Sequence, residues 1–197
     1  MTSTSFDEPN SAKKTSHLQL WLVLLVCVMP FFAAVILHMF WTPSSQMNYG
    51  ELVEPVPLPD DALTLLTGGS LQMSSLRGKW ILAQVDQGTC DPYCVEKLWK
   101  IRQLRLTQGK NMSRIERLWL ISDESAVREP LLTEYQGQIN VRASESFIHR
   151  FPKGHDLRDH IWIIDPLGNI FMRYPRGADP SLIKNDLIRL LKVSQIG

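Results

Sequence analysis

The cysteine pair at Cys90 and Cys94 constrains the fold most, because of the segments on either side of it. The apolar residues 80–85 come before the pair and predict a buried strand. Residues 95–106 follow it and have the spacing of a helix. The two sulfurs therefore stand where a strand gives way to a helix N-terminus, and there the helix dipole favours thiolates. Thiolates at such a place can exchange disulfides or bind a soft metal ion.

The rest of the C-terminal part alternates strands with helices and then ends in a hairpin and a helix. Asp179 is a predicted helix cap, and Pro180 suits the first position of that last helix. The order predicts an α/β fold in which helices cover both faces of a mixed sheet. The further predicted strands are 117–122, 139–142, 160–164 and 169–174, the further predicted helix is 125–136, weakened by Pro130, and a first hairpin is predicted at 63–73.

An uncharged stretch near the N-terminus predicts a membrane anchor. Residues 18–41 contain no Asp, Glu, Lys or Arg. As a helix rising about 1.5 Å per residue they would extend roughly 36 Å, enough to cross a hydrocarbon core of about 30 Å. The alternative is a cleaved signal peptide, but the apolar run is longer than the usual apolar region of such peptides and no small-residue cleavage site follows cleanly. We therefore expect one N-terminal transmembrane helix.

The distribution of charge predicts how this helix is oriented. Lys13 and Lys14 precede the apolar stretch, and the next basic residue after it is Arg77. The positive-inside rule then places the N-terminus in the cytoplasm and the C-terminal domain outside, in the periplasm if the protein is bacterial. The 21 Lys and Arg residues balance 20 Asp and Glu residues. With no basic patch in the sequence, we expect no nucleic-acid partner.

Three sequence features resemble the SCO/SenC family, whose members are membrane-anchored, thioredoxin-like proteins of cytochrome c oxidase assembly. They are residues 76–80 (Leu-Arg-Gly-Lys-Trp), the Cys-x-x-x-Cys spacing, and Asp159-His160 directly before the apolar strand and turn at 161–168. The sequence departs from the family at Val95, where proline is usual. The resemblance implies a thioredoxin-like α/β fold, a mixed sheet with flanking helices. The resemblance covers residues 62–197, the predicted thioredoxin-like domain. Composition divides the chain before it into a polar tail (1–17), a transmembrane helix (18–41) and a proline-rich linker (42–61).

The resemblance also implies a site. In the family a histidine at the place of His160 joins the two cysteines in binding copper, so Cys90, Cys94 and His160 are the expected ligands of one copper ion. Two thiolates and an imidazole suit copper and exclude calcium or magnesium. His155 is a rival ligand, His160 could instead be a buried hydrogen-bonded residue, and the cysteines could form a merely structural disulfide.

Three functions remain open at this point. The first is a copper-handling assembly factor that passes copper to the copper-containing subunit of cytochrome c oxidase. The second is an enzyme, a thiol–disulfide oxidoreductase with Cys90 and Cys94 as catalytic residues, which keeps the cysteines of that subunit reduced without binding metal. The third is a non-catalytic scaffold of oxidase biogenesis.

Overall fold

The computed structural model describes residues 17–40, 48–154 and 156–194. These residues belong to two compact units, divided between residues 46 and 47. Most of the predicted tail, the first residues of the predicted linker, and the rival ligand His155 lie outside the described residues.

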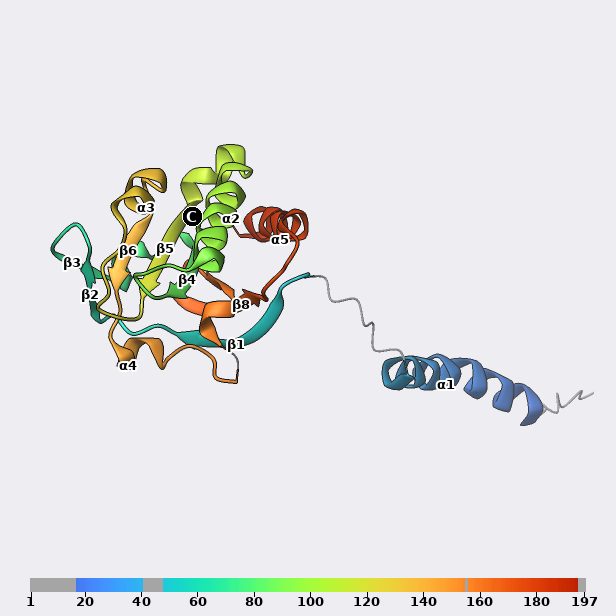
Figure 1. The fold of residues 1–197 in the computed structure, drawn as a ribbon. Helices are drawn as coiled ribbons and strands as arrows, with labels where there is room; N and C mark the ends of the chain where they lie inside the picture. Colours follow the sequence, from blue (N-terminus) through green and yellow to red (C-terminus); the bar gives the residue numbers. More distant parts are fainter. Residues whose placement is uncertain (1–16, 41–47, 155, 195–197) are drawn as a thin grey trace, which may run out of the picture. The chain divides into compact units, whose positions relative to one another are not determined.

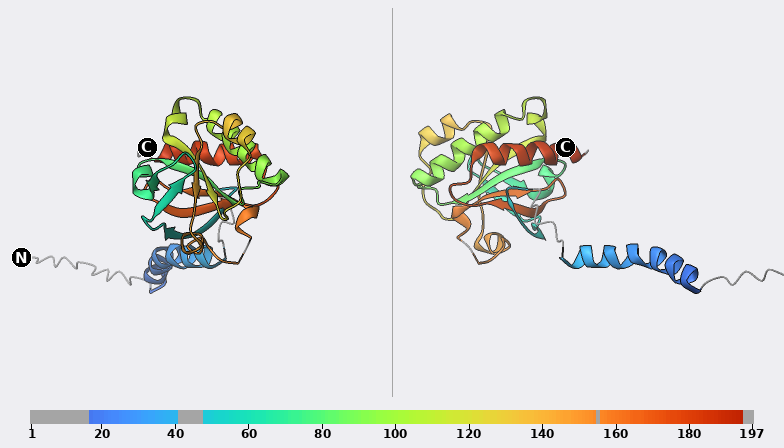
Figure 2. Two further views of the ribbon diagram at one scale, coloured as in Figure 1. Left: turned by 60° about the vertical axis from the view of Figure 1, so that its left-hand side comes forward. Right: turned by 90° about the vertical axis from the view of Figure 1, so that its right-hand side faces the viewer.

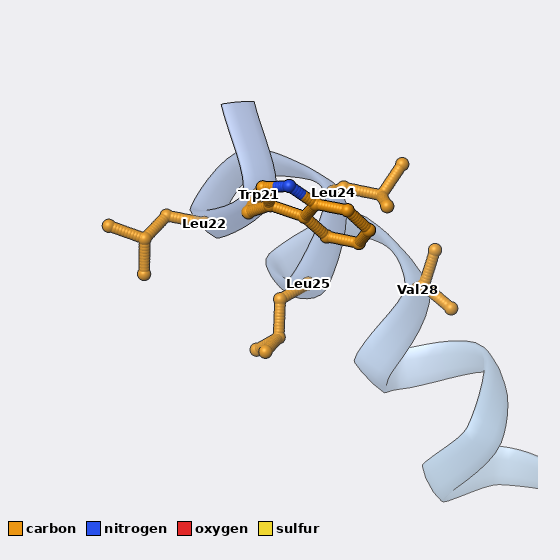
Figure 3. Close-up of a pocket in the computed structure, with 5 residues that line it drawn as sticks. All are labelled: Trp21, Leu22, Leu24, Leu25 and Val28. Atoms are coloured by element: carbon orange, nitrogen blue, oxygen red, sulfur yellow. The ribbon is translucent and has the colours of Figure 1, made fainter. Parts of the chain in front are cut away.

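The first unit is the helix α1 (His17–Phe40), which contains Pro30. Within it, residues 19–37 are long and apolar enough to cross a membrane, and none of them is buried inside the protein. Apolar side chains of its first turns line a hollow on the outside of the helix (Figure 3). Length, composition and exposed apolar side chains all agree with a single-pass membrane anchor. The side chains around the hollow are Trp21, Leu22, Leu24, Leu25 and Val28, all exposed.

The second unit is built on one eight-stranded mixed sheet (Figure 1). Strand β4 lies inside the sheet, parallel to β5 on one side and antiparallel to β7 on the other. All seven residues of β4 are buried, as expected for a strand covered on both faces. In spatial order the strands are β1 (Glu51–Pro57), β8 (Asn169–Tyr174), β7 (Ile161–Ile164), β4 (Trp80–Asp86), β5 (Ile115–Ile121), β6 (Ile139–Arg142), β2 (Ala62–Leu65) and β3 (Ser70–Gln72).

Helices and loops cover the two faces of the sheet (Figure 2). On one face α2 (Pro92–Leu106) and α5 (Pro180–Val193) pack over Trp80 and Leu82 of β4, and α3 (Glu129–Glu134) packs beside the cysteines. On the other face α4 (Glu145–Ile148) places Phe147 against Ile81 and Ala83. Successive residues of β4 alternate between these two cores. The remaining helical turns are η1 (Met73–Leu76), η2 (Gly109–Arg114) and η3 (Leu157–Asp159).

The predicted α/β fold with a mixed sheet and flanking helices is confirmed. The sequence-based strands and helices lie within a few residues of the observed ones, and Asp179 caps α5 by accepting a hydrogen bond from the Ser181 amide. The sequence suggested that Pro130 interrupts a helix, but it does not. It stands in the first turn of α3, where its missing N–H leaves no intrahelical hydrogen bond unmade.

Strand β1 departs from the predicted domain organisation. Its residues, 51–57, lie inside the segment 42–61 that was predicted to be a linker, yet β1 pairs antiparallel with β8. Glu51 accepts a hydrogen bond from Arg173 at 2.8 Å, and just before the strand the Gly50 amide donates to Asp186 at 2.8 Å. This part of the chain therefore belongs to the sheet, and a linker can include only the residues before it.

Candidate functional site

The cysteines lie where β4 leads into α2, and the intervening residues shape the turn. Asp91 caps the helix because its Oδ1 accepts a hydrogen bond from the Cys94 amide at 2.8 Å, and Pro92 begins the first turn. That hydrogen bond, with help from Arg158, lowers the pKa of the Asp91 carboxyl. Cys94 is thus in the first helical turn. Cys90 precedes the cap at a φ of +46° and lies outside the helix.

Cys90 and Cys94 form a disulfide, with their Cα atoms 5.1 Å apart. That separation is ordinary for a disulfide. Both residues are buried, Cys94 completely. They pack in one apolar cluster with Leu98, Trp119, Ile121, Leu131 and Tyr135.

The loop that follows β5 holds the backbone of residues 88–90 by hydrogen bonds. The Gly88 amide donates to Asp123 at 2.8 Å, and the Thr89 amide donates to the Ser125 hydroxyl at 3.1 Å. Burial would raise the pKa of Asp123, but the hydrogen bonds it accepts outweigh burial and lower it. Arg128 donates to the Cys90 carbonyl at 3.2 Å. The loop therefore fixes the turn that carries Cys90.

On the other side, the segment before His160 is held against the cysteine-bearing helix. Tyr93 donates from its hydroxyl to the Asp159 carbonyl at 3.1 Å, and Arg158 donates to Asp91 at 2.9 Å. Burial raises the pKa of Tyr93 to about 12, so its hydroxyl remains a donor over the physiological range. Asp91 and Tyr93, which lie between the two cysteines, thus contact the two residues before His160.

His160 itself is buried, and its ring lies beside Trp162 with centroids 5.4 Å apart. Its Nδ1 is 2.9 Å from the Asp156 carbonyl oxygen. A neutral histidine that donates from Nδ1 to a carbonyl has its lone pair on Nε2, and this is the arrangement that commonly orients histidines bound to metals. The same contact also satisfies the alternative of a buried hydrogen-bonded histidine.

A buried ion pair lies under the same region. Lys97 Nζ is 2.6 Å from Asp86 Oδ2, and neither side chain is more than 2% exposed. Lys97 also donates to the Arg158 carbonyl, and Arg158 Nε lies 3.5 Å from Asp86 Oδ1. Burial raises the pKa of Asp86 and lowers the pKa of Lys97, while their mutual attraction acts the other way. The pair joins β4, α2 and the segment before His160.

Sequence reasoning missed Gln84, whose Nε2 lies 3.5 Å from the Cys94 sulfur. The signal was present as one amide in the otherwise apolar run of residues 80–85. Nothing in the sequence alone, however, places that amide beneath Cys94 rather than on the other face of the sheet.

Two thiolates and an imidazole, the donors predicted for copper, are ligand types that copper prefers. The oxidised cysteine pair, however, supplies no thiolate. The two sulfurs are bonded to each other. Across residues 17–40, 48–154 and 156–194, no three His, Cys, Asp or Glu side chains are grouped so that they could hold a metal ion. Binding through Cys90, Cys94 and His160 therefore requires the reduced pair, and this ligand set remains a prediction.

A family model described as "transmembrane-like, thioredoxin-like, C-terminal domain" matches residues 80–194, more than half of the chain. The chain belongs to this transmembrane-like, thioredoxin-like family. The match includes the cysteine turn, the Gln84 and Asp86 positions, and His160. No curated protein matches the sequence.

Solved structures agree on the fold. Yeast Sco1 with copper bound aligns with a TM-score of 0.60 at 15% identity, covering 72% of this chain and 96% of that one. ScoI of Arabidopsis thaliana with copper bound gives 0.57 at 15% identity, covering 72% and 98%. A putative protein disulfide isomerase from Bacteroides thetaiotaomicron gives 0.52 at 19% identity, covering 74% and 95%. The predicted resemblance to SCO/SenC proteins is thus confirmed in the fold.

Proposed function

We propose that this protein is a membrane-anchored copper-handling factor of cytochrome c oxidase assembly. Cys90, Cys94 and His160 bind one copper ion as cargo and deliver it to the copper-containing subunit of the oxidase. The single observation that carries the proposal is the contact between the cysteine turn and the segment before His160, through Tyr93–Asp159 and Arg158–Asp91. These contacts hold the two residues before His160 against the cysteine turn, which supports a soft-ligand set drawn from these two parts of the chain.

The protein groups have separate tasks in this proposal. An external dithiol first reduces the disulfide by thiol–disulfide exchange and is itself oxidised to a disulfide, because a bonded sulfur pair cannot supply two thiolate ligands. The Asp156 carbonyl keeps the Nδ1 proton of His160 in place and leaves Nε2 as the ligand atom. Two thiolates and one imidazole then offer copper(I) a soft, low-coordinate site.

The membrane anchor and its orientation complete the proposal. Helix α1 tethers the protein, its N-terminus is cytoplasmic, and the sheet domain works outside the membrane. A topology reporter fused after residue 197 should be active only when exported. Activity of a cytoplasmic reporter at that position would reverse the orientation.

Copper(I) titration of the anaerobically reduced full chain, against a competing chelator, tests the ligand set. We expect one equivalent to bind, and His160→Ala to weaken binding by about tenfold or more. His149→Ala is the matched control, since His149 is exposed and pairs with Glu145 on the surface. If the wild type binds no more tightly than Cys90→Ser, the copper function is lost.

The disulfide itself favours a second candidate, a thiol–disulfide reductase for the same oxidase subunit. In each turnover the Cys90–Cys94 dithiol would become a disulfide while a disulfide of the subunit became a dithiol, and an external dithiol would restore the pair. His160 has no role in that reaction. Normal oxidase assembly with His160→Ala, and loss of assembly with Cys90→Ser, would therefore favour the reductase. Normal assembly with both cysteines replaced would leave only a scaffold.

A further inference from the structure

Gln84 carries the single side-chain amide among the seven buried residues of β4. It lies on β4 between Leu82 and Asp86 on the face that meets α2, because alternate residues of a strand share a face. It pairs with Trp119 of β5, and its side chain is completely buried. Trp119 belongs to the apolar cluster that surrounds the disulfide. Gln84 is therefore a polar side chain in contact with that cluster.

The contacts of Gln84 point to the sulfur. Its Nε2 lies 3.5 Å from Cys94 Sγ, and its Oε1 is buried without a hydrogen-bond partner in the part of the chain that the structure describes. Burying an amide with half of its hydrogen-bonding capacity unused costs stability, and an apolar side chain of the same length would avoid that cost. The stability of the fold therefore does not explain a glutamine at this position. A side chain that donates a hydrogen bond to the Cys94 sulfur does explain it.

We propose that Gln84 is a positioning residue that stabilises the reduced form of the Cys90–Cys94 pair. Reduction adds two electrons and two protons, breaks the S–S bond and leaves a sulfur on Cys94 that is a thiol or thiolate. Such a sulfur accepts a hydrogen bond more strongly than a disulfide sulfur does, and most strongly as a thiolate. The amide of Gln84 therefore shifts the equilibrium toward the dithiol. The inference rests on the proposed function only in requiring the pair to cycle between dithiol and disulfide.

The reduction potential of the pair tests the inference without any metal. The full chain is purified in detergent, with Cys27→Ala in every sample because Cys27 is a free exposed thiol, and equilibrated with mixtures of reduced and oxidised glutathione. Alkylation of free thiols followed by mass analysis gives the fraction of dithiol. We expect Gln84→Met to lower the equilibrium constant for reduction about tenfold, a potential about 30 mV more negative.

Gln108→Met is the matched control. Gln108 is also a buried glutamine, but its Nε2 donates to the Leu104 carbonyl and the Thr107 hydroxyl, away from the sulfurs. This variant should lose stability and keep the wild-type potential. A shift in Gln84→Met no larger than that in Gln108→Met, or a shift toward easier reduction, would overturn the inference.

Two further outcomes keep the inference separate from the copper proposal. If Gln84→Met fails to fold, Gln84→Asn replaces it, because the shorter amide should no longer reach Cys94 and should shift the potential in the same direction. A protein that shows the expected shift but binds no copper(I) would refute the proposed function and support the inference. Copper binding with an unshifted potential would refute the inference alone.

Discussion

Replacing Lys97 by methionine would remove one partner of the buried ion pair that joins β4, α2 and the segment before His160. In the native protein Lys97 Nζ lies 2.6 Å from Asp86, and both side chains are almost fully buried. The substitution keeps most of the aliphatic volume and removes the charge. Asp86 would then be left in the interior with Arg158, whose Nε lies 3.5 Å from Asp86 Oδ1, as a cationic neighbour.

The magnitude follows from this geometry. Removing one partner of a buried pair usually costs about 3–5 kcal/mol, since the other charge is left uncompensated. Because Arg158 remains near Asp86, we expect about 3 kcal/mol, at the lower end of that range. With a urea m-value of about 2 kcal/mol/M, the unfolding midpoint should fall by roughly 1.5 M. Adding Asp86→Asn to the variant should recover most of this loss, because no buried charge of the pair then remains.

Urea unfolding of the domain fragment 48–197, followed by tryptophan fluorescence, measures the effect. Lys100→Met is the matched control, since Lys100 lies on the same helix and pairs at 2.7 Å with Glu96, which is half exposed. That pair should contribute less than about 1 kcal/mol. A loss below 1 kcal/mol for Lys97→Met, or no recovery in the double variant, would refute the reasoning.

Three further predictions concern the domain. A fragment of residues 62–197 should unfold at lower urea than 48–197 because it lacks β1, and equal midpoints would show that β1 adds nothing. Burial and a neighbouring carboxylate raise the pKa of Tyr174 above 10.0, so the stability that its neutral form contributes is present below about pH 10 and is lost as the pH rises. The unfolding free energy of Tyr174→Phe, measured by urea titration, should therefore decline less steeply at alkaline pH than that of the wild type. Gly88→Ala should cost about 1–3 kcal/mol by the same assay, because its Cβ would lie 2.3 Å from the Ser125 carbonyl oxygen, and an unchanged midpoint would contradict this close approach.

Elements whose signals are local could be predicted from the sequence. The apolar run of 80–85 predicts a buried strand wherever it lies, and Asp179 with Pro180 marks a helix start without reference to the rest of the chain. The closeness of Cys90 and Cys94 is likewise local, because four residues at a helix start cannot separate them far. The periodicity of apolar residues and the signals for helix capping depend only on neighbouring residues, so strands and helix starts can be predicted before the fold is known.

Features that depend on contacts between distant parts of the chain could be seen only in the folded protein. Strand β1 was missed because it is a mostly exposed edge strand with prolines, which lacks the burial pattern of an inner strand. The Tyr93–Asp159 contact joins residues 66 positions apart, and the Gln84–Cys94 contact depends on how α2 packs on β4. No local pattern encodes these distances. They follow from the packing of the sheet and helices, which brings the cysteine turn, the segment before His160 and a buried amide to one place.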